Sequence, residues 1–232
     1  STIRDHYVAY FTAPGAARVL AVGETMTLSV EVNASSFAST DATHQFRLGL
    51  FNSAHASFPT ASPVGRYAAD LAADATGLNS ASGSGASAAD GYFVIYNTIS
   101  AFGPNHVGAV VASRATSAAA SQSLYGPGSA GTANPTVNNF DTGAAVSSYA
   151  TAGTAFNVTL NIYRNDSTHV TVTSTFGSYT SMANQVIASS EGGYTFDTLI
   201  ISDYGSAGNL GSALAVSGGS YTLDNISVQV VK

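Results

Sequence analysis

The 232-residue sequence contains no cysteine and no tryptophan, and its only lysine is Lys232. Without cysteine the fold cannot depend on disulfide bonds, so a hydrophobic core must supply its stability. Charged residues make up 9% of the chain, far below the roughly 25% of a typical globular protein. Because the seven basic residues form no cluster, nucleic acids and anionic membranes are poor candidate partners.

Long apolar runs and common enzyme motifs are also missing. No stretch reaches the roughly 18 apolar residues of a membrane-spanning helix, so no transmembrane segment is expected. No nucleophile elbow, phosphate-binding loop or dinucleotide fingerprint occurs. The sequence starts at Ser1 without a methionine or an apolar leader, which is typical of a trimmed product. Serine, threonine, asparagine and glycine supply most of the polar surface, as in many exported proteins, so we expect a secreted or cell-surface location.

What the sequence does contain is the alternation of apolar and polar residues that is typical of β-strands. In 156–163, for example, Phe156, Val158, Leu160 and Ile162 alternate with Asn157, Thr159, Asn161 and Tyr163. The pattern predicts strands at 6–11, 26–32, 46–50, 92–96, 107–111, 156–163, 170–176, 196–201 and 221–231. We therefore expect one all-β domain spanning 1–232, a two-layer antiparallel β-sandwich of the jelly-roll kind.

Several connections are also predicted. The polar residues 163–169 can turn the 156–163 strand back as a hairpin, and 21–25 form a short turn before the strand at 26–32. The alanine-rich segment 68–75 could form one or two helical turns. Residues 74–90 and 113–155 are expected to be long loops, which either run over the surface or shape a binding cleft.

The last strand contains a break in its alternation. Tyr221 and Leu223 occupy one phase, whereas Ile226, Val228 and Val230 occupy the other. The pattern slips by one residue at 224–225, which predicts either a β-bulge or a strand buried on both faces.

Acidic residues and amides offer oxygen ligands of the kind that calcium prefers. Asp224 and Asn225, at the slip, are the first candidates for a structural Ca²⁺ site, and Asp197 and Asp203, beside the 196–201 strand, are the second. The alternative is that all four serve turns and strand edges.

Aromatic side chains provide flat faces for stacking on sugars, and tyrosine adds a hydroxyl group. The sequence has 12 tyrosines, among which Tyr92, Tyr96 and Tyr125 are candidate ligand-binding residues together with Arg47. The absence of tryptophan removes the strongest stacking platform.

No catalytic residue can be assigned. The glutamates Glu24, Glu31 and Glu191 stand in separate contexts, without the spacing that would pair two carboxylates on one strand. No two histidines have metal-ligand spacing. One alternative is a polysaccharide lyase, which can use histidine and tyrosine as base and acid and an arginine or a metal to stabilise the uronate. His44 beside Arg47, or His106 beside Tyr96, could fit such a role.

Four short motifs occur in order along the chain: GETMTLSV at 23–30, FRLGLFNS at 46–53, FDTL at 196–199 and LDNISV at 223–228. In these the sequence resembles exported bacterial β-sandwich proteins that carry a C-terminal sorting tail of the Pro-Glu-Pro type. More loosely, it is similar to concanavalin A-like and carbohydrate-binding jelly rolls. In the latter an aspartate of the final strand often binds a structural Ca²⁺, which implies that role for Asp224. The sorting tail is not part of this sequence.

The leading hypothesis is therefore a non-enzymatic extracellular or cell-surface β-sandwich that binds glycan or belongs to a surface matrix. A second hypothesis is a self-assembling subunit of a filament or surface layer, in which residues 1–11 add to the sheet of a neighbouring copy. A third is a polysaccharide lyase or glycoside hydrolase.

Overall fold

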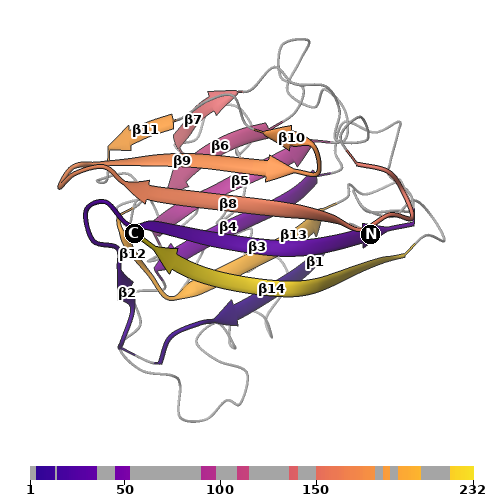
Figure 1. Cartoon of the computed structure of the whole chain (residues 1–232), viewed down its shortest axis with the longest axis horizontal. Helices are drawn as coiled ribbons and strands as arrows, with labels where there is room; N and C mark the ends of the chain where they lie inside the picture. Colours follow the sequence, from indigo (N-terminus) through magenta and orange to yellow (C-terminus); the bar gives the residue numbers. More distant parts are fainter. Residues whose placement is uncertain are drawn as a thin grey trace.

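The computed structural model of the chain describes residues 4–13, 15–35, 45–52, 90–97, 109–114, 136–140, 150–180, 185–188, 193–204 and 220–232. All regular secondary structure in these ranges is β-strand, and the strands form two large antiparallel sheets that lie face to face (Figure 1). The predicted class, an all-β two-layer antiparallel sandwich, is confirmed. None of the described residues belongs to a helix that could span a membrane.

The first sheet contains, in spatial order, β1 (Arg4–Tyr10), β13 (Thr198–Tyr204), β4 (Gln45–Asn52), β5 (Asp90–Asn97), β6 (Ala109–Arg114) and β7 (Thr136–Phe140). The second contains β10 (Tyr179–Thr180), β9 (His169–Phe176), β8 (Phe156–Arg164), β3 (Thr25–Ala34) and β14 (Tyr221–Val231), and β11 (Gln185–Ala188) also pairs with β9. A small third sheet joins β2 (Arg18–Val19) to β12 (Thr195–Phe196).

The second sheet is amphipathic. In β3 the side chains of Met26, Leu28 and Val30 are fully buried, whereas Thr27 and Ser29 between them are only half-buried. The same alternation runs through β8 and β9. Because successive side chains of a strand point to opposite faces, this sheet has one apolar inner face and one polar outer face.

The first sheet, by contrast, is buried on both faces around β5. Tyr92, Val94 and Tyr96 belong to the core between the sheets, and Phe93 and Ile95 on the opposite face are also fully buried. Burial on both faces explains why 92–96 is a continuous apolar run rather than an alternating one.

Aromatic side chains hold the two sheets together. The ring of Phe176, on β9, lies 6.1 Å from that of Phe46 and 4.9 Å from that of Tyr96, both of the first sheet. The Tyr96 hydroxyl donates a hydrogen bond of 2.9 Å to the carbonyl oxygen of Thr175. A buried hydroxyl that has found such a partner adds specificity to the core without leaving an unpaired polar group.

Some predicted boundaries are wrong. The segment 113–155 is not one long loop, because β7 (Thr136–Phe140) lies within it and pairs with β6. The strand predicted at 107–111 is β6, at Ala109–Arg114. The predicted helical turns at 68–75 lie outside the described residues, and so does the loop predicted at 74–90 except for its last residue, Asp90, which is the first residue of β5.

The N-terminal strand pairs within its own chain. β1 lies antiparallel to β13, with Arg4 opposite Tyr204 and Tyr10 opposite Thr198. In this structure the segment completes its own first sheet as the outermost strand, and its addition to a neighbouring copy stays a prediction.

The predicted slip in the last strand is a β-bulge, and the alternative of a strand buried on both faces is wrong. Asp224 pairs with Glu31 and Ser227 with Ser29, so Asn225 and Ile226 together stand opposite the single residue between those two. Asn225 has a φ of 48°, a left-handed conformation that asparagine tolerates better than most residues. Its backbone N–H donates to Asp224 Oδ1 at 2.8 Å, and its Nδ2 donates to Glu31 Oε2 at 3.1 Å.

We expect Asn225→Val to lower the free energy of unfolding by about 1–2 kcal/mol, because a β-branched residue is strained at positive φ. Asn225→Gly should change it by less than about 0.5 kcal/mol, because glycine adopts this conformation freely. Urea unfolding of both variants checks this. Equal destabilisation by valine and glycine would show that the Glu31 hydrogen bond, and not the backbone, controls the position.

Candidate functional site

The two outer faces of the sandwich differ in what they offer a ligand. On the first sheet, Phe93, Ile95 and Ile200 are fully buried and only 5% of Arg47 is exposed. On the second sheet, the outer side chains are half-buried or exposed, and Figure 1 shows β9, β8, β3 and β14 in front with no other described element across them. The outer face of the second sheet is therefore the candidate site.

Three rows of side chains cross this face, each with one residue from β3, β8 and β9. We call them together the polar face: Thr25, Tyr163 and Thr171; Thr27, Asn161 and Thr173; Ser29, Thr159 and Thr175. Neighbouring strands are about 4.8 Å apart and successive rows about 6.8 Å apart. All nine side chains are uncharged, and all can donate and accept hydrogen bonds.

Hydrogen bonds between strands orient these side chains. Thr27 donates to Asn161 Oδ1 at 2.7 Å, and Asn161 Nδ2 donates to Thr173 Oγ1 at 3.4 Å. The hydroxyls of Thr159 and Thr175 are 2.7 Å apart. A hydroxyl has one donor and two acceptor sites, and an amide nitrogen has two donors, so these bonds leave capacity toward solvent. Side chains fixed in this way lose little entropy when a ligand binds.

Tyr163 gives the polar face an aromatic surface. It is the last outward-facing residue of β8, it lies between Thr25 and Thr171, and 40% of it is exposed. Val231 of β14 pairs with Thr25 in the same row and is 54% exposed. The row therefore combines an accessible ring with hydroxyl groups, which is the pairing that sugar recognition uses.

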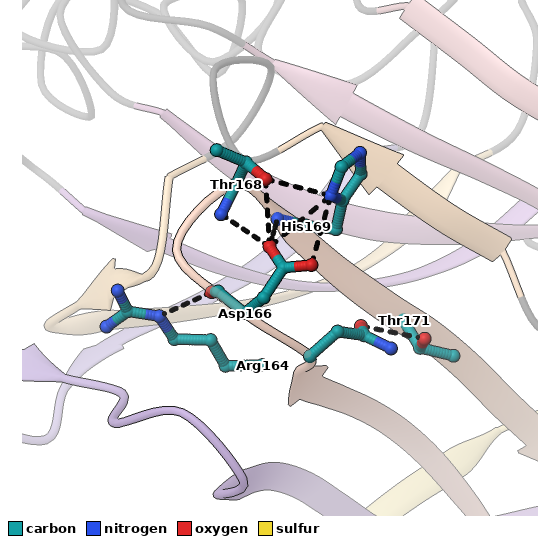
Figure 2. Close-up of polar contacts among 6 residues, drawn as sticks. Arg164, Asp166, Thr168, His169 and Thr171 are labelled. Atoms are coloured by element: carbon teal, nitrogen blue, oxygen red, sulfur yellow. Dashed lines mark hydrogen bonds and ion pairs between the residues drawn. The ribbon is translucent and has the colours of Figure 1, made fainter.

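The hairpin beside Tyr163 is fixed by Asp166, as Figure 2 shows. Asp166 Oδ1 accepts hydrogen bonds from the backbone N–H groups of Thr168, at 2.6 Å, and His169, at 2.8 Å. These hydrogen bonds lower the pKa of Asp166 to about 2, and the one from Thr168 has the largest effect. Thr171 donates to Asn165 Oδ1 at 2.9 Å. The hairpin predicted at 163–169 is confirmed, and Asp166 serves its turn geometry.

A second polar group lies at one end of the core. Asp90 begins β5, its Oδ1 is shielded from solvent, and that atom has no hydrogen-bond partner within the described part of the chain. Gly193 has a φ of 69°, and a Cβ there would lie 2.7 Å from Asp90 Oδ2. The Tyr92 hydroxyl donates to the Gly193 carbonyl oxygen at 2.9 Å. Only glycine lets the backbone approach the carboxyl group this closely.

Burial raises the pKa of Asp90 to about 6, and the negative charge of Asp197 adds to the rise. Hydrogen bonds from the backbone N–H of Asp90 and from the Asn52 side chain act in the opposite direction. Asp197 is itself buried, and its Oδ1 accepts a hydrogen bond of 2.6 Å from the Thr198 hydroxyl. The Asp90 carboxyl group is thus poorly compensated when it is ionised near neutral pH.

The predicted ligand-binding residues do not lie together in one accessible site. Tyr92 and Tyr96 are fully buried between the sheets with their hydroxyls bound to carbonyl oxygens, so they are core residues and cannot stack on a ligand. Arg47 is buried on the outer face of the first sheet. Tyr125, like His44 and His106 of the lyase hypothesis, lies outside the described residues.

The predicted metal ligands lie in different places. Asp224 and Asn225 are on the second sheet, whereas Asp197 immediately precedes β13 of the first sheet and Asp203 lies near the end of that strand. Asp197 and Asp203 are six steps apart along an extended chain, which amounts to about 20 Å. Among the described residues, no three histidine, aspartate or glutamate side chains come together. The four candidates therefore do not form one site.

Comparisons with known proteins concern the fold. No protein-family profile matches the sequence, and no curated protein does. Among solved structures, lectin II from Ulex europaeus is 16% identical with a TM-score of 0.40, covering 99% of this chain and 82% of that one. A galactose complex of the lectin UEA-II is 16% identical with a TM-score of 0.35, covering 89% and 70%. An alginate lyase in complex with alginate trisaccharide is 11% identical with a TM-score of 0.38, covering 100% and 82%. These values are too low to transfer an activity.

Tyr163 is the site residue that the sequence prediction missed. Its signal was present, because Tyr163 shares the phase of Asn157, Thr159 and Asn161 rather than that of the apolar residues. An aromatic residue in the polar phase of an amphipathic strand is expected on the outer face, where it is accessible.

Proposed function

We propose that this chain is a non-enzymatic β-sandwich that binds polysaccharide through the polar face. The observation that carries the proposal is the accessible ring of Tyr163 beside oriented, uncharged hydroxyl and amide groups on three strands. Sugar rings present C–H faces that pack on aromatic rings, and their hydroxyls exchange hydrogen bonds with just such side chains. A face that spans three strands suits an extended chain, because several sugar units can contact it at once.

The nature of the polar face also favours binding over catalysis. Glycoside hydrolysis needs two carboxyl groups across one sugar bond, and a lyase needs a base beside its substrate. None of the nine residues of the polar face has a carboxyl or imidazole group. The histidines of the lyase hypothesis, His44 and His106, lie outside the described ranges, and their proposed partners Arg47 and Tyr96 are buried. An ultraviolet assay for unsaturated uronates and a reducing-sugar assay would both stay at background if the chain only binds.

Binding can be tested at a single hydroxyl group. Thr173→Val removes the hydroxyl in the middle row and keeps the shape and strand preference of the side chain, so affinity for a bound polysaccharide should fall about 3–10-fold. Isothermal titration against a panel of soluble polysaccharides measures this. Thr154→Val, in the exposed segment before β8, is the matched control and should bind like the wild type. A panel in which nothing binds the wild type would overturn the proposal.

An extracellular or cell-surface location and a structural Ca²⁺ remain proposals. The first is supported by the low charge and the polar strand surfaces, and fractionation of the native cells tests it. The second is supported only by oxygen donors such as Asp224 and Glu31, which pair across β14 and β3. A shift of the thermal unfolding midpoint between EDTA and Ca²⁺ would support it, and identical midpoints would exclude it.

Self-assembly through β14 is less well supported than binding. β14 is the last strand of the second sheet, which would suit pairing with another copy. Its bulge at Asn225 bends the strand, however, and bulges on edge strands hinder such pairing. Light scattering over a range of concentrations would reveal assembly.

A further inference from the structure

The polar face offers no cation to a ligand. Its nine side chains are neutral, and so are Gln229 and Ser227, which continue the second and third rows onto β14. The charged or ionisable groups of the described residues around it lie on its borders and are Glu24, Glu31, Asp166, Asp224, Arg18, Arg164, His169 and Lys232.

The basic groups on these borders are largely engaged by the chain itself. Arg18 is paired with Glu24 at 2.8 Å. Arg164 donates to the Leu20 carbonyl oxygen at 2.6 Å, and its guanidinium lies 3.6 Å from the centre of the Tyr194 ring. His169 Nδ1 lies 3.3 Å from the Asp166 carboxylate. Lys232 is exposed after the end of β14, outside the three rows.

Acidic groups, in contrast, flank the face at both ends. Asp224 and Glu31 lie opposite each other beyond the third row. At the other end, hydrogen bonds in the turn lower the pKa of Asp166 to about 2, so its carboxylate stays charged at any ordinary pH. A chain that extends along the strands beyond the third row would therefore approach negative charge. At the hairpin end, Asp166 and Glu24 stand beside the basic groups of Arg18, Arg164 and Lys232.

We infer that the polar face selects neutral polysaccharide chains and discriminates against polyuronates, an inference that rests on the proposed function. The carboxylate of a uronic acid placed on this face would lose water without gaining a cation, and an uncompensated charge is costly to desolvate. The carboxylates of Asp224 and Glu31, beyond the third row, add repulsion, which suppresses the wrong partner more than it changes the affinity for the right one. Hydroxyl groups of a neutral chain meet no such penalty.

Matched polymer pairs test this selectivity. Hydroxyethyl cellulose and carboxymethyl cellulose share a backbone, and so do highly methyl-esterified and de-esterified homogalacturonan. For any pair in which binding is detected, we expect the protein to bind the neutral polymer at least about 10-fold more tightly than the charged one. Isothermal titration at about 20 mM NaCl measures both affinities. Equal or tighter binding of the charged member would overturn the inference and leave the proposed function standing. If neither member of any pair binds, nor any other neutral polysaccharide, the proposed function fails and the inference with it.

A gain-of-binding variant provides the complementary test. Thr173→Lys places a cation at the centre of the polar face and should shift the preference toward the charged member by about 10-fold. Glu31→Gln combined with Asp166→Asn keeps one acceptor oxygen on each side chain but removes both negative charges from the border. This double variant should reduce the difference in affinity between the neutral and the charged polymer, and only at low salt. Folding of each variant is checked by circular dichroism and thermal unfolding. An unchanged preference in a folded Thr173→Lys protein would contradict the inference.

Discussion

Asp90→Asn is expected to raise the free energy of unfolding near pH 7.5 by about 2 kcal/mol and to remove the part of its pH dependence between about pH 4 and pH 7 that Asp90 contributes. The carboxyl group has a pKa of about 6 in the folded chain, against an ordinary value of 3.8. A gap of this size corresponds to about 3 kcal/mol at most, and partial access to solvent reduces it. Asparagine keeps the shape of the side chain but carries no charge.

The sign of the effect follows from which state binds the proton more tightly. Because the folded-state pKa of Asp90 is raised, its protonated form stabilises the fold below about pH 4, and this contribution is lost as the pH rises through about 6. The contribution of Asp90 to the free energy of unfolding of the wild type should therefore fall between pH 4 and pH 7. Guanidinium unfolding at several pH values gives the slope, and its difference between variant and wild type isolates Asp90.

Asp166→Asn is the matched control, because the pKa of Asp166 is lowered, not raised. Its contribution is present above the ordinary pKa and is lost only as the pH falls toward 2, so this variant should leave the slope between about pH 4 and pH 7 unchanged. A pH slope as steep in Asp90→Asn as in the wild type would contradict the assignment. If Ca²⁺ stabilises the wild type at pH 7 and not Asp90→Asn, a cation rather than a proton offsets this charge.

The strands of the second sheet could be predicted well because one of their faces meets solvent. Alternation in 26–32 and 156–163 follows directly from this difference between faces. The first sheet is buried on both faces around β5, so the apolar run 92–96 predicts a strand but does not indicate which of its residues point outward. Tyr92 and Tyr96 were consequently assigned to a ligand surface although they form the core.

The bulge at Asn225 was predictable for a different reason. A one-residue insertion reverses the phase of all later residues, and that reversal is visible in sequence as the shift from Leu223 to Ile226. The role of the bulge was not predictable, since it depends on β14 being the last strand of its sheet. Edge position is a property of topology, which local patterns do not encode.

The candidate site was beyond sequence prediction for the same reason. Thr27 and Asn161 are 134 residues apart in sequence and hydrogen-bonded in the fold. Each strand showed a polar phase, but the order β9-β8-β3 that places these phases side by side comes only from the structure. The sequence therefore predicted the polar residues one strand at a time and not the surface that they form together.

Tyr163→Ala is expected to weaken polysaccharide binding about 10-fold or more, because the ring is the only aromatic surface among the nine residues of the polar face. Covering one face of the ring removes apolar area from water and contributes about 1–2 kcal/mol. Tyr163→Phe keeps this area and loses one hydroxyl group, so it should bind within about 3-fold of the wild type.

The molecule offers a matched control for this substitution in Tyr7, which is 45% exposed against 40% for Tyr163 but lies on β1 of the first sheet. Tyr7→Ala removes a similar exposed ring and should leave affinity unchanged in the same titration. Both tyrosines are accessible, so each substitution should cost less than about 1 kcal/mol of stability, which thermal unfolding checks. Equal loss of binding in the two variants would mean that the polar face is not the site, and full binding by a folded Tyr163→Ala protein would mean that the ring takes no part. A loss confined to Tyr163→Ala, with Tyr163→Phe retained, would identify stacking on the outer face of the second sheet as the source of affinity.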